Sequence, residues 1–218
     1  MRVRNIYLIT FFCFLLFFSC TTKVNNTTIV YNNDFESNNL SGISNGIITI
    51  YNGTNVLGRY NKGSFSLTVG NLPSHDLITI SFDLYIHDTW DGNKPSPDGP
   101  DNWQMLVDGS SYINTTFSNN PCSANVFCAP QSYPANYPNN YNNPKTDAFR
   151  TDLPGVCAEA GIIGWTTQYK ITKTIRHTAG TVVLVCLDNL VQTNLPTNQQ
   201  LCDESWSVDN IQIQAINQ

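Results

Sequence analysis

The residues best suited to chemistry lie in one acidic stretch, from residue 88 to residue 109. It contains five aspartates and a single basic residue, Lys94. Calcium takes six to eight oxygen ligands from carboxylates, amides and carbonyls, usually on a flexible loop. We therefore predict a calcium site whose candidate ligands are Asp88, Asp91, Asn93, Asp98 and Asp101. The alternative is that the Asp-Gly pairs are turn formers, which explains Asp108 better than the others.

A second carboxylate set joins the two ends of the chain. In many jelly rolls the first and last strands lie side by side, so Asp34 or Glu36 could approach Asp209 and hold a structural cation. The alternative is that these side chains only cap turns or bond to nearby backbone.

Aromatic residues in the loops suggest a glycan platform, because sugar rings stack on exposed aromatic faces. The candidates are Trp90, Tyr133, Tyr137 and Tyr141. Against this, large aromatic side chains are usually mostly buried, so each ring could pack under its own loop. For Trp103, which begins a strand, we expect burial.

Signals for catalysis are weak. The glutamates are scattered at Glu36, Glu159 and Glu204, and the histidines are isolated along the chain. No nucleophile elbow, zinc-protease motif or phosphate-binding loop is present. We expect a protein without catalytic activity, and a glycan-active enzyme is the weakest of three alternatives.

The N-terminal residues are typical of a secretory signal. Arg2 and Arg4 precede an apolar run at 6–18, which is too short to span a membrane as a helix. Ser19-Cys20 resembles a bacterial lipobox, although Phe17 stands where Leu is usual. We predict a signal peptide at 1–19, lipidation of Cys20, a polar tether at 20–28 and a single domain at 29–218. The protein would then be an extracytoplasmic lipoprotein of the outer membrane or cell surface. The alternative is plain secretion.

The charge balance opposes nucleic-acid binding, which requires a basic surface. Without Arg2 and Arg4, nine basic residues face sixteen acidic ones, a net charge of about −7. We therefore expect a glycan or a surface protein as partner, and contact with the membrane only through the lipid.

Five cysteines follow Cys20, and disulfides are the default in an oxidising compartment. Cys122 and Cys128 can close a small loop, and Cys186 and Cys202 flank a connection between two strands. Cys157 is then left over, or it replaces one partner of the first pair.

The elements that must position these residues are strands. Alternating or continuous apolar runs predict strands near 28–36, 47–51, 64–69, 78–86, 103–107, 112–117, 164–175, 181–187 and 205–213. The segment 118–154 has no hydrophobic periodicity and is expected to be a long, packed loop. Short strands without a helical pattern predict an all-β fold, an antiparallel sandwich of jelly-roll type.

Several motifs resemble those of a family of secreted bacterial β-modules. They are Asp88-Thr89-Trp90-Asp91-Gly92-Asn93, Gly99-Pro100-Asp101-Asn102-Trp103, Val107-Asp108-Gly109, Thr115-Thr116-Phe117-Ser118-Asn119, Gln131-Ser132-Tyr133-Pro134 and the stretch from Asp203 to Ile211. This resemblance implies an extracellular module and no catalytic activity.

A looser resemblance is to lectin-like jelly rolls, including the MAM type, through Asp34-Phe35-Glu36 and the strand from Trp206 to Ile211. The expectation is a lipid-anchored binding module, calcium-stabilised and carbohydrate-binding. The alternative is a structural or adhesive surface protein.

Overall fold

The computed structural model describes residues 26–120, 122, 128–193 and 196–218. The predicted signal peptide and Cys20 lie outside these residues. In the described part of the chain, no helix combines the length and hydrophobicity needed to cross a membrane. The elements are β1 (Asn26–Asn33), β2 (Ile43–Ser44), β3 (Ile48–Tyr51), β4 (Thr54–Tyr60), β5 (Ser64–Gly70), β6 (Leu77–Asp88), β7 (Asn102–Val107), β8 (Ser110–Thr116), β9 (Arg150–Pro154), η1 (Cys157–Glu159), β10 (Ile163–Arg176), β11 (Thr181–Asn189), α1 (Gln200–Asp203) and β12 (Glu204–Asn217).

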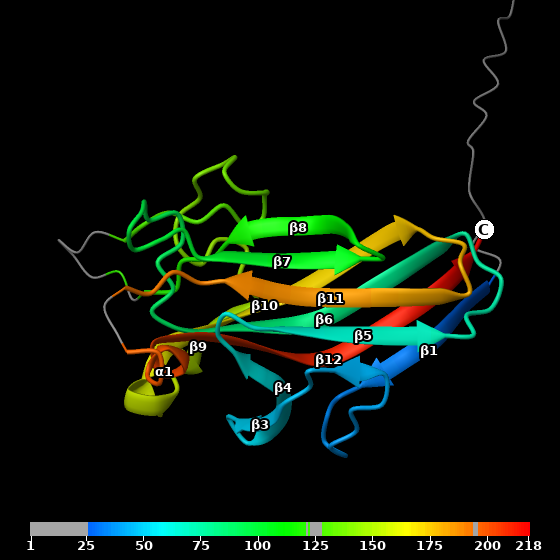
Figure 1. The fold of residues 1–218 in the computed structure, drawn as a ribbon, viewed down its shortest axis with the longest axis horizontal. Helices are drawn as coiled ribbons and strands as arrows, with labels where there is room; N and C mark the ends of the chain where they lie inside the picture. The colour runs from blue at the N-terminus through cyan, green and yellow to red at the C-terminus, as the bar shows by residue number, and fades with distance from the viewer. Residues whose placement is uncertain (1–25, 121, 123–127, 194–195) are drawn as a thin grey trace, which may run out of the picture.

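The strands form two antiparallel sheets that face each other (Figure 1). One sheet has the order β3-β4-β12-β6-β10-β9, with β1 also paired to β12, and the other has the order β2-β5-β11-β7-β8. The pairs are nested along the chain, with β4 on β12, β5 on β11, β6 on β10 and β7 on β8. This nesting is the jelly-roll arrangement, so the predicted fold class is confirmed.

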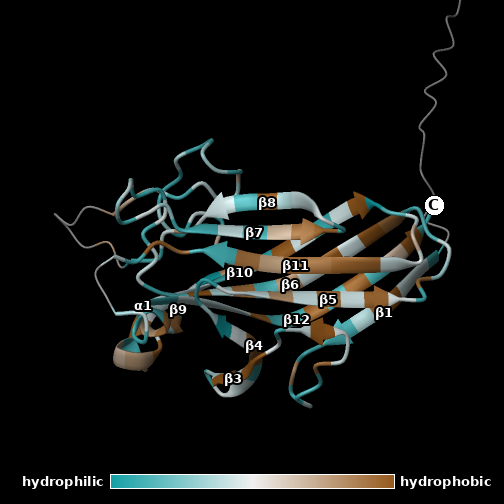
Figure 2. Cartoon of the chain, viewed as in Figure 1, coloured by the Kyte–Doolittle hydropathy of each residue, from teal (hydrophilic) through white to brown (hydrophobic). Residues whose placement is uncertain are grey.

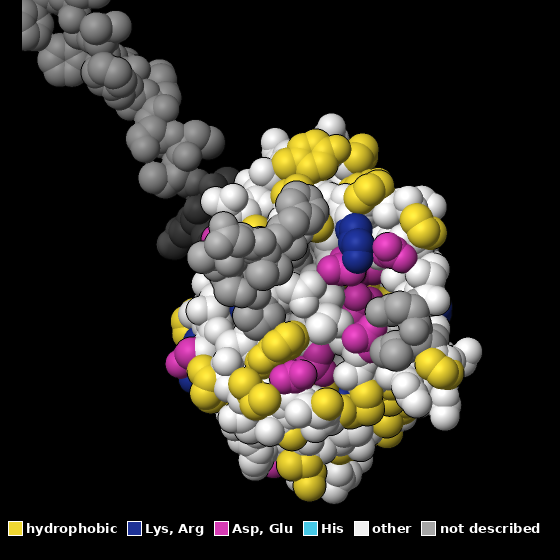
Figure 3. Space-filling model, turned by 90° about the vertical axis from the view of Figure 1, so that its left-hand side faces the viewer, with side chains coloured by type: hydrophobic (Ala, Val, Ile, Leu, Met, Phe, Trp, Pro, Cys, Tyr) yellow, Lys and Arg dark blue, Asp and Glu magenta, His cyan; other side chains and the backbone are white. Residues whose placement is uncertain are grey.

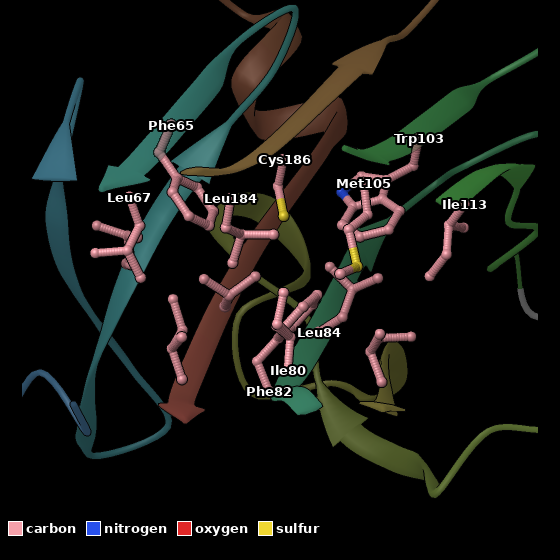
Figure 4. Packing of buried hydrophobic residues seen from close by; sticks show 14 of the residues in the cluster. Phe65, Leu67, Ile80, Phe82, Leu84, Trp103, Met105, Ile113, Leu184 and Cys186 are labelled. Atoms are coloured by element: carbon pink, nitrogen blue, oxygen red, sulfur yellow. The ribbon is translucent and has the colours of Figure 1, made fainter. Parts of the chain in front are cut away.

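The core lies between the sheets and follows from the alternation of the strands. Along β6, every second residue from Ile78 to Ile86 is buried, as a period of two requires for a half-buried strand. Leu84 of β6, Trp103 of β7 and Leu184 of β11 meet in the same cluster (Figure 4). Brown segments alternate with paler ones along β6, whereas β11 is brown over most of its length (Figure 2); alternating and continuous apolar runs of this kind predicted the sandwich.

Three parts of the first sheet differ from the prediction. β4 was not predicted, because Gly58 and Arg59 interrupt its apolar alternation. β9 lies inside the segment expected to be a loop. β1 begins at Asn26, within the expected tether, and ends at Asn33, so Asp34, Phe35 and Glu36 form a turn and not a strand. These segments are short or polar, and their neighbours in the sheet decide their conformation.

The long loop is held by buried amide side chains, as expected of a packed loop. Gln131 is fully buried, and its backbone exchanges hydrogen bonds with that of Asn142 at 2.9 and 2.7 Å. Its side-chain amide donates to the carbonyl of Thr146 and accepts from the backbone N–H of Lys145. A single glutamine therefore ties together three separate points of the loop.

One disulfide was predicted with its correct partners and the other was not. Cys122 pairs with Cys128, as predicted. Cys202 pairs with Cys157, whereas the prediction paired it with Cys186. Cys186 is unpaired and fully buried, because its position on β11 points it between the sheets. The observed bond joins η1 to α1, directly before β12.

Candidate functional site

The connections at one end of the sandwich enclose a polar pocket of about 250 Å³. It lies between the β6–β7 loop and the β11–β12 connection. Its lining consists mainly of acids, amides and hydroxyls: Thr89, Asp91, Lys94, Asp98, Asn120, Val191, Gln192, Thr193, Asp203 and Glu204. Seen from this end, acidic side chains gather around one basic side chain (Figure 3). We call this the carboxylate pocket.

The β6–β7 loop is shaped by a glycine and a buried aspartate. Gly92 has a φ of +61°, and a Cβ atom there would lie 2.5 Å from the carbonyl oxygen of Pro130, so only glycine fits. Asp101 is fully buried and accepts from the backbone N–H of Asp91 at 2.6 Å and of Val191 at 3.2 Å. It therefore joins the two connections behind the pocket.

The rim of the pocket carries an ion-pair group. Lys94 Nζ lies 2.9 Å from Asp91 Oδ2 and 3.7 Å from Asp98 Oδ2. The other oxygen of each aspartate accepts a hydrogen bond, from Asn120 at 2.9 Å and from the Thr193 hydroxyl at 2.7 Å. The hydrogen bond and charge of Asp91 raise the pKa of Lys94 against its partial desolvation.

Two further acids line the pocket that sequence analysis did not propose as ligands. Asp203, at the end of α1, accepts from the Thr89 hydroxyl and from the Gln192 amide, both at 2.9 Å. Glu204, the first residue of β12, pairs with Asp88 across the sheet. The pairing of two long strands thus brings Glu204 beside a loop that lies about a hundred residues earlier in the chain.

Glu204 differs from its neighbours because nothing described bonds to its carboxylate. Its side chain is 3% exposed, and the buried Oε2 has no hydrogen-bond partner among the described residues. Burial raises the pKa of Glu204 well above its usual value, and the carboxylates of Asp101 and Asp203 raise it further. A buried acceptor without a donor costs about 1–3 kcal/mol.

The structure does not bring the five proposed calcium ligands together. The Asp88 carboxylate accepts from the backbone N–H of Val156 at 3.1 Å, beside η1, and burial raises its pKa to about 7. Asn93 Oδ1 accepts from the hydroxyls of Thr116 and Ser132. Asp91, Asp98 and Asp101 remain near the pocket. Among the described residues, no three His, Cys, Asp or Glu side chains are grouped so that they could hold a metal ion. Calcium therefore stays a prediction.

The second set, Asp34, Glu36 and Asp209, lies where β1 ends beside β12. Glu36 accepts from the backbone N–H of Asn55 at 2.9 Å, and Asp34 from that of Glu36 at 3.2 Å. Burial, followed by the charges of Asp83, Glu36 and Asp34, raises the pKa of Asp209 to about 6. The three acids are therefore close enough to interact. The observed hydrogen bond of Asp34 is a local turn contact, whereas that of Glu36 goes to the backbone of β4.

The four rings of the proposed aromatic platform differ in their exposure. Trp90 is fully buried and donates to the carbonyl of Ser205 at 2.9 Å. Tyr133 packs on Phe117 and Tyr169, with ring centroids 5.0 and 5.1 Å apart. The burial of Trp90 in the core contradicts its predicted role in stacking on a sugar. Tyr133 is half-buried and packs against the core, so its glycan contact stays a prediction. Tyr137 is half-buried, and Tyr141 is 68% exposed.

The histidines are not isolated in the structure. His75 and His177 stack at the end of the sandwich opposite the pocket, with Nε2 of His75 2.6 Å from Nδ1 of His177. His87 is fully buried between the hydroxyls of Thr166 and Ser207, and desolvation lowers its pKa to about 3. It therefore stays neutral as a core residue.

No protein-family model matches the chain, and no curated protein sequence matches it. Solved structures align over most of it at low identity. A family 35 carbohydrate-binding module from Clostridium thermocellum is 12% identical, with 86% of this chain and 97% of that chain covered and a TM-score of 0.39. The C-terminal family 6 carbohydrate-binding module of LamC from Zobellia galactanivorans is 13% identical, covering 86% and 98%, with a TM-score of 0.37. Dimeric latent PorU from Porphyromonas gingivalis is 8% identical, covering 90% of this chain and 14% of that one, with a TM-score of 0.44. Similarity at this level does not decide what this chain binds.

Proposed function

We propose that the protein is a non-catalytic binding module whose carboxylate pocket holds the end of a glycan. The observation that carries this proposal is the unbonded carboxylate of Glu204, which is buried and opens on the pocket. The ionised form of this carboxylate accepts hydrogen bonds and donates none, so a ligand that binds the ionised form must present a donor.

The lining favours a ligand rich in hydroxyl groups. Asp91, Asp98 and Asp203 present acceptor oxygens, and Gln192 and Asn120 carry amides. A sugar ring offers several hydroxyl donors at short spacing, which matches such a wall. A cavity of about 250 Å³ lies below the usual range of about 300–1,000 Å³ for ligand pockets. It therefore suits one terminal residue and not a long chain.

The proposed setting is extracytoplasmic, with a lipid on Cys20 as the anchor. Two disulfides, Cys122–Cys128 and Cys157–Cys202, support an oxidising compartment. Calcium binding is a separate prediction, and the proposed binding of a glycan in the pocket does not require it.

Calorimetric titration with a panel of neutral and charged oligosaccharides tests the proposal. Wild type is compared with Glu204→Gln and with Asp147→Asn, an exposed acid on another loop that lines a different pocket. We expect at least one oligosaccharide to bind wild type and Asp147→Asn equally and to bind Glu204→Gln at least tenfold more weakly.

Two results would contradict the proposal. One is binding that Glu204→Gln leaves unchanged, which would place the ligand elsewhere. The other is release of new reducing ends from the oligosaccharide, in a Glu204-dependent manner, which would indicate an enzyme with a carboxylic acid as proton donor.

A further inference from the structure

The carboxylate pocket has a strong excess of negative charge. Four acids line it, and Asp101 lies directly behind it. The one basic residue among the described lining residues is Lys94, at the rim, with its side chain 37% exposed. Figure 3 shows acidic side chains beside one basic side chain and continuing from it across this face. Charged groups in a confined, low-dielectric cavity interact more strongly than at an open surface, so the pocket attracts cations.

The pocket already binds an ammonium group, at its rim. Lys94 Nζ lies between Asp91 and Asp98, at 2.9 and 3.7 Å. An ammonium offers three donors and carries the charge that the acids lack. The rim therefore shows that Asp91 and Asp98 accept an ammonium group, alongside the Asn120 amide and the Thr193 hydroxyl.

The deeper part of the pocket has an acid and no such donor. Asp203 accepts hydrogen bonds from Thr89 and Gln192, and Asp101 accepts them from two backbone N–H groups. Glu204 receives no hydrogen bond from any described residue, and its side chain is nine-tenths or more buried. A hydroxyl would supply a donor only, whereas an ammonium would supply donors and neutralise the charge of Glu204.

We propose that the carboxylate pocket is selective for a ligand that carries a primary ammonium group, which binds at Glu204. This inference rests on the proposed function and names the class of glycan, an amino sugar with a free amine. Lys94 acts as an internal competitor for the same acids at the rim.

A consequence for pH follows from the charge of Glu204. The pair with an ammonium needs the ionised carboxylate, and the carboxylates of Asp91, Asp101 and Asp203 around it favour its protonated form when no ligand is bound. Lys94 opposes this effect. Where the ligand's amine is already protonated, binding therefore displaces a proton from Glu204, and affinity falls as the pH is lowered further.

The test compares two matched ligands, a glucosamine oligomer and the N-acetylglucosamine oligomer of the same length. Titration calorimetry at pH 7 is run with wild type, Glu204→Gln, Lys94→Met and the control Lys170→Met, an exposed lysine outside the pocket. We expect the free amine to bind wild type at least tenfold more tightly than the acetylated form. We also expect Glu204→Gln to abolish this difference, Lys94→Met to increase the affinity several-fold, and Lys170→Met to change nothing. In two buffers of different ionisation enthalpy at about pH 5, where the sugar amine is already protonated, the heats should show proton release.

Equal, Glu204-dependent affinity for both oligomers would overturn the ammonium inference and leave the proposed function standing. Calcium chloride alone is a separate arm. A Glu204-dependent rise in melting temperature with calcium, without any binding of the glucosamine oligomer, would overturn the inference in favour of a metal ion. If no oligosaccharide in the panel binds and calcium has no effect, both the inference and the proposed function fail.

Discussion

Two buried carboxylates at the same end of the sandwich, one near the end of β11 and one at the start of β12, have opposite surroundings. Asp188, in β11, receives four hydrogen bonds, from the backbone N–H groups of Lys62, Gly63 and Leu190 and from the indole of Trp206. Glu204, two residues before Trp206, receives none from the described residues. Both are less than a tenth exposed. A fully bonded buried acid fixes the fold, whereas an unbonded one beside a cavity is suited to a ligand.

Removal of the Cys157–Cys202 disulfide should have the largest effect on stability and should separate the roles of Glu204 and Asp188. The bond closes a loop of 45 residues and holds α1 ahead of Glu204. Its loss should lower the free energy of unfolding by about 4 kcal/mol, from the chain entropy of a loop of that length. Urea denaturation of the Cys157→Ser, Cys202→Ser double variant measures this. Loss of ligand affinity with the indole of Trp206 still in its native environment, seen by near-ultraviolet dichroism, would show that the bond positions Glu204 and not Asp188.

Asp188→Asn should have the next largest effect. In the variant, an NH₂ group replaces one carboxylate oxygen and faces hydrogen-bond donors. These donors are either Gly63 N–H and the Trp206 indole, or Lys62 N–H and Leu190 N–H. Leaving these donors unpaired should cost about 3 kcal/mol. Chemical denaturation provides the number, with Asp147→Asn as the matched control. A cost below that of the control would mean that Asp188 is not the structural acid of the pair.

Glu204→Gln should stabilise the protein, whereas Asp188→Asn should destabilise it. Burial and neighbouring carboxylates raise the pKa of Glu204 above its ordinary value of 4.5. The folded protein therefore holds a proton that the unfolded chain releases, and this residue's contribution to stability falls as the pH rises above about 4.5. The variant should match wild type near pH 4 and be more stable by about 1 kcal/mol at pH 8. Thermal unfolding of both proteins across that range tests the sign. Asp88 has the same sign and cancels in the difference, whereas Asp101 interacts with Glu204 and contributes to the difference with the same sign. A less stable variant at pH 8 would mean that a bonded role for Glu204 has been missed.

Asp98→Asn should have the smallest effect on stability. Its side chain is 46% exposed and lies at the rim, 3.7 Å from Lys94 Nζ, and exposed ion pairs contribute about 0–1 kcal/mol. We expect a change within about 0.5 kcal/mol in the same denaturation assay. A larger loss of stability would mean that Asp98, at the rim, is also a structural acid.

The sequence predicts more of the fold than of the site, for a physical reason. Strands such as β6 and β10 are long and half-buried, so their alternation is visible along the chain. β4 contains Gly58 and Arg59, and its burial depends on β12, which local pattern does not reveal. The same limitation explains the disulfide, because Cys157 meets Cys202 only through the packing of η1 against α1.

The site was half predicted. The density of aspartates identified the β6–β7 loop, and three of its acids lie at the pocket or behind it. Asp203 and Glu204 come from the other end of the chain, and the signal that could have found them is the expected last strand beginning beside two acids. The burial of Trp90 and Tyr133 could not be predicted from sequence, because the identity of an aromatic residue in a loop does not show whether its ring faces solvent or the core.

The pairing of β1 with β12 sets the direction in which the pocket faces. Asn26 lies opposite Asn217 at one end of β12, and Glu204 begins the other end. At about 3.3 Å per residue, the fourteen residues of this strand separate the two ends by about 40 Å. If the predicted lipid on Cys20 anchors the chain, the pocket lies at the end of β12 away from the anchored end. Repeated sugar ends on a facing polymer could then engage many copies together, so that avidity compensates for a weak single site.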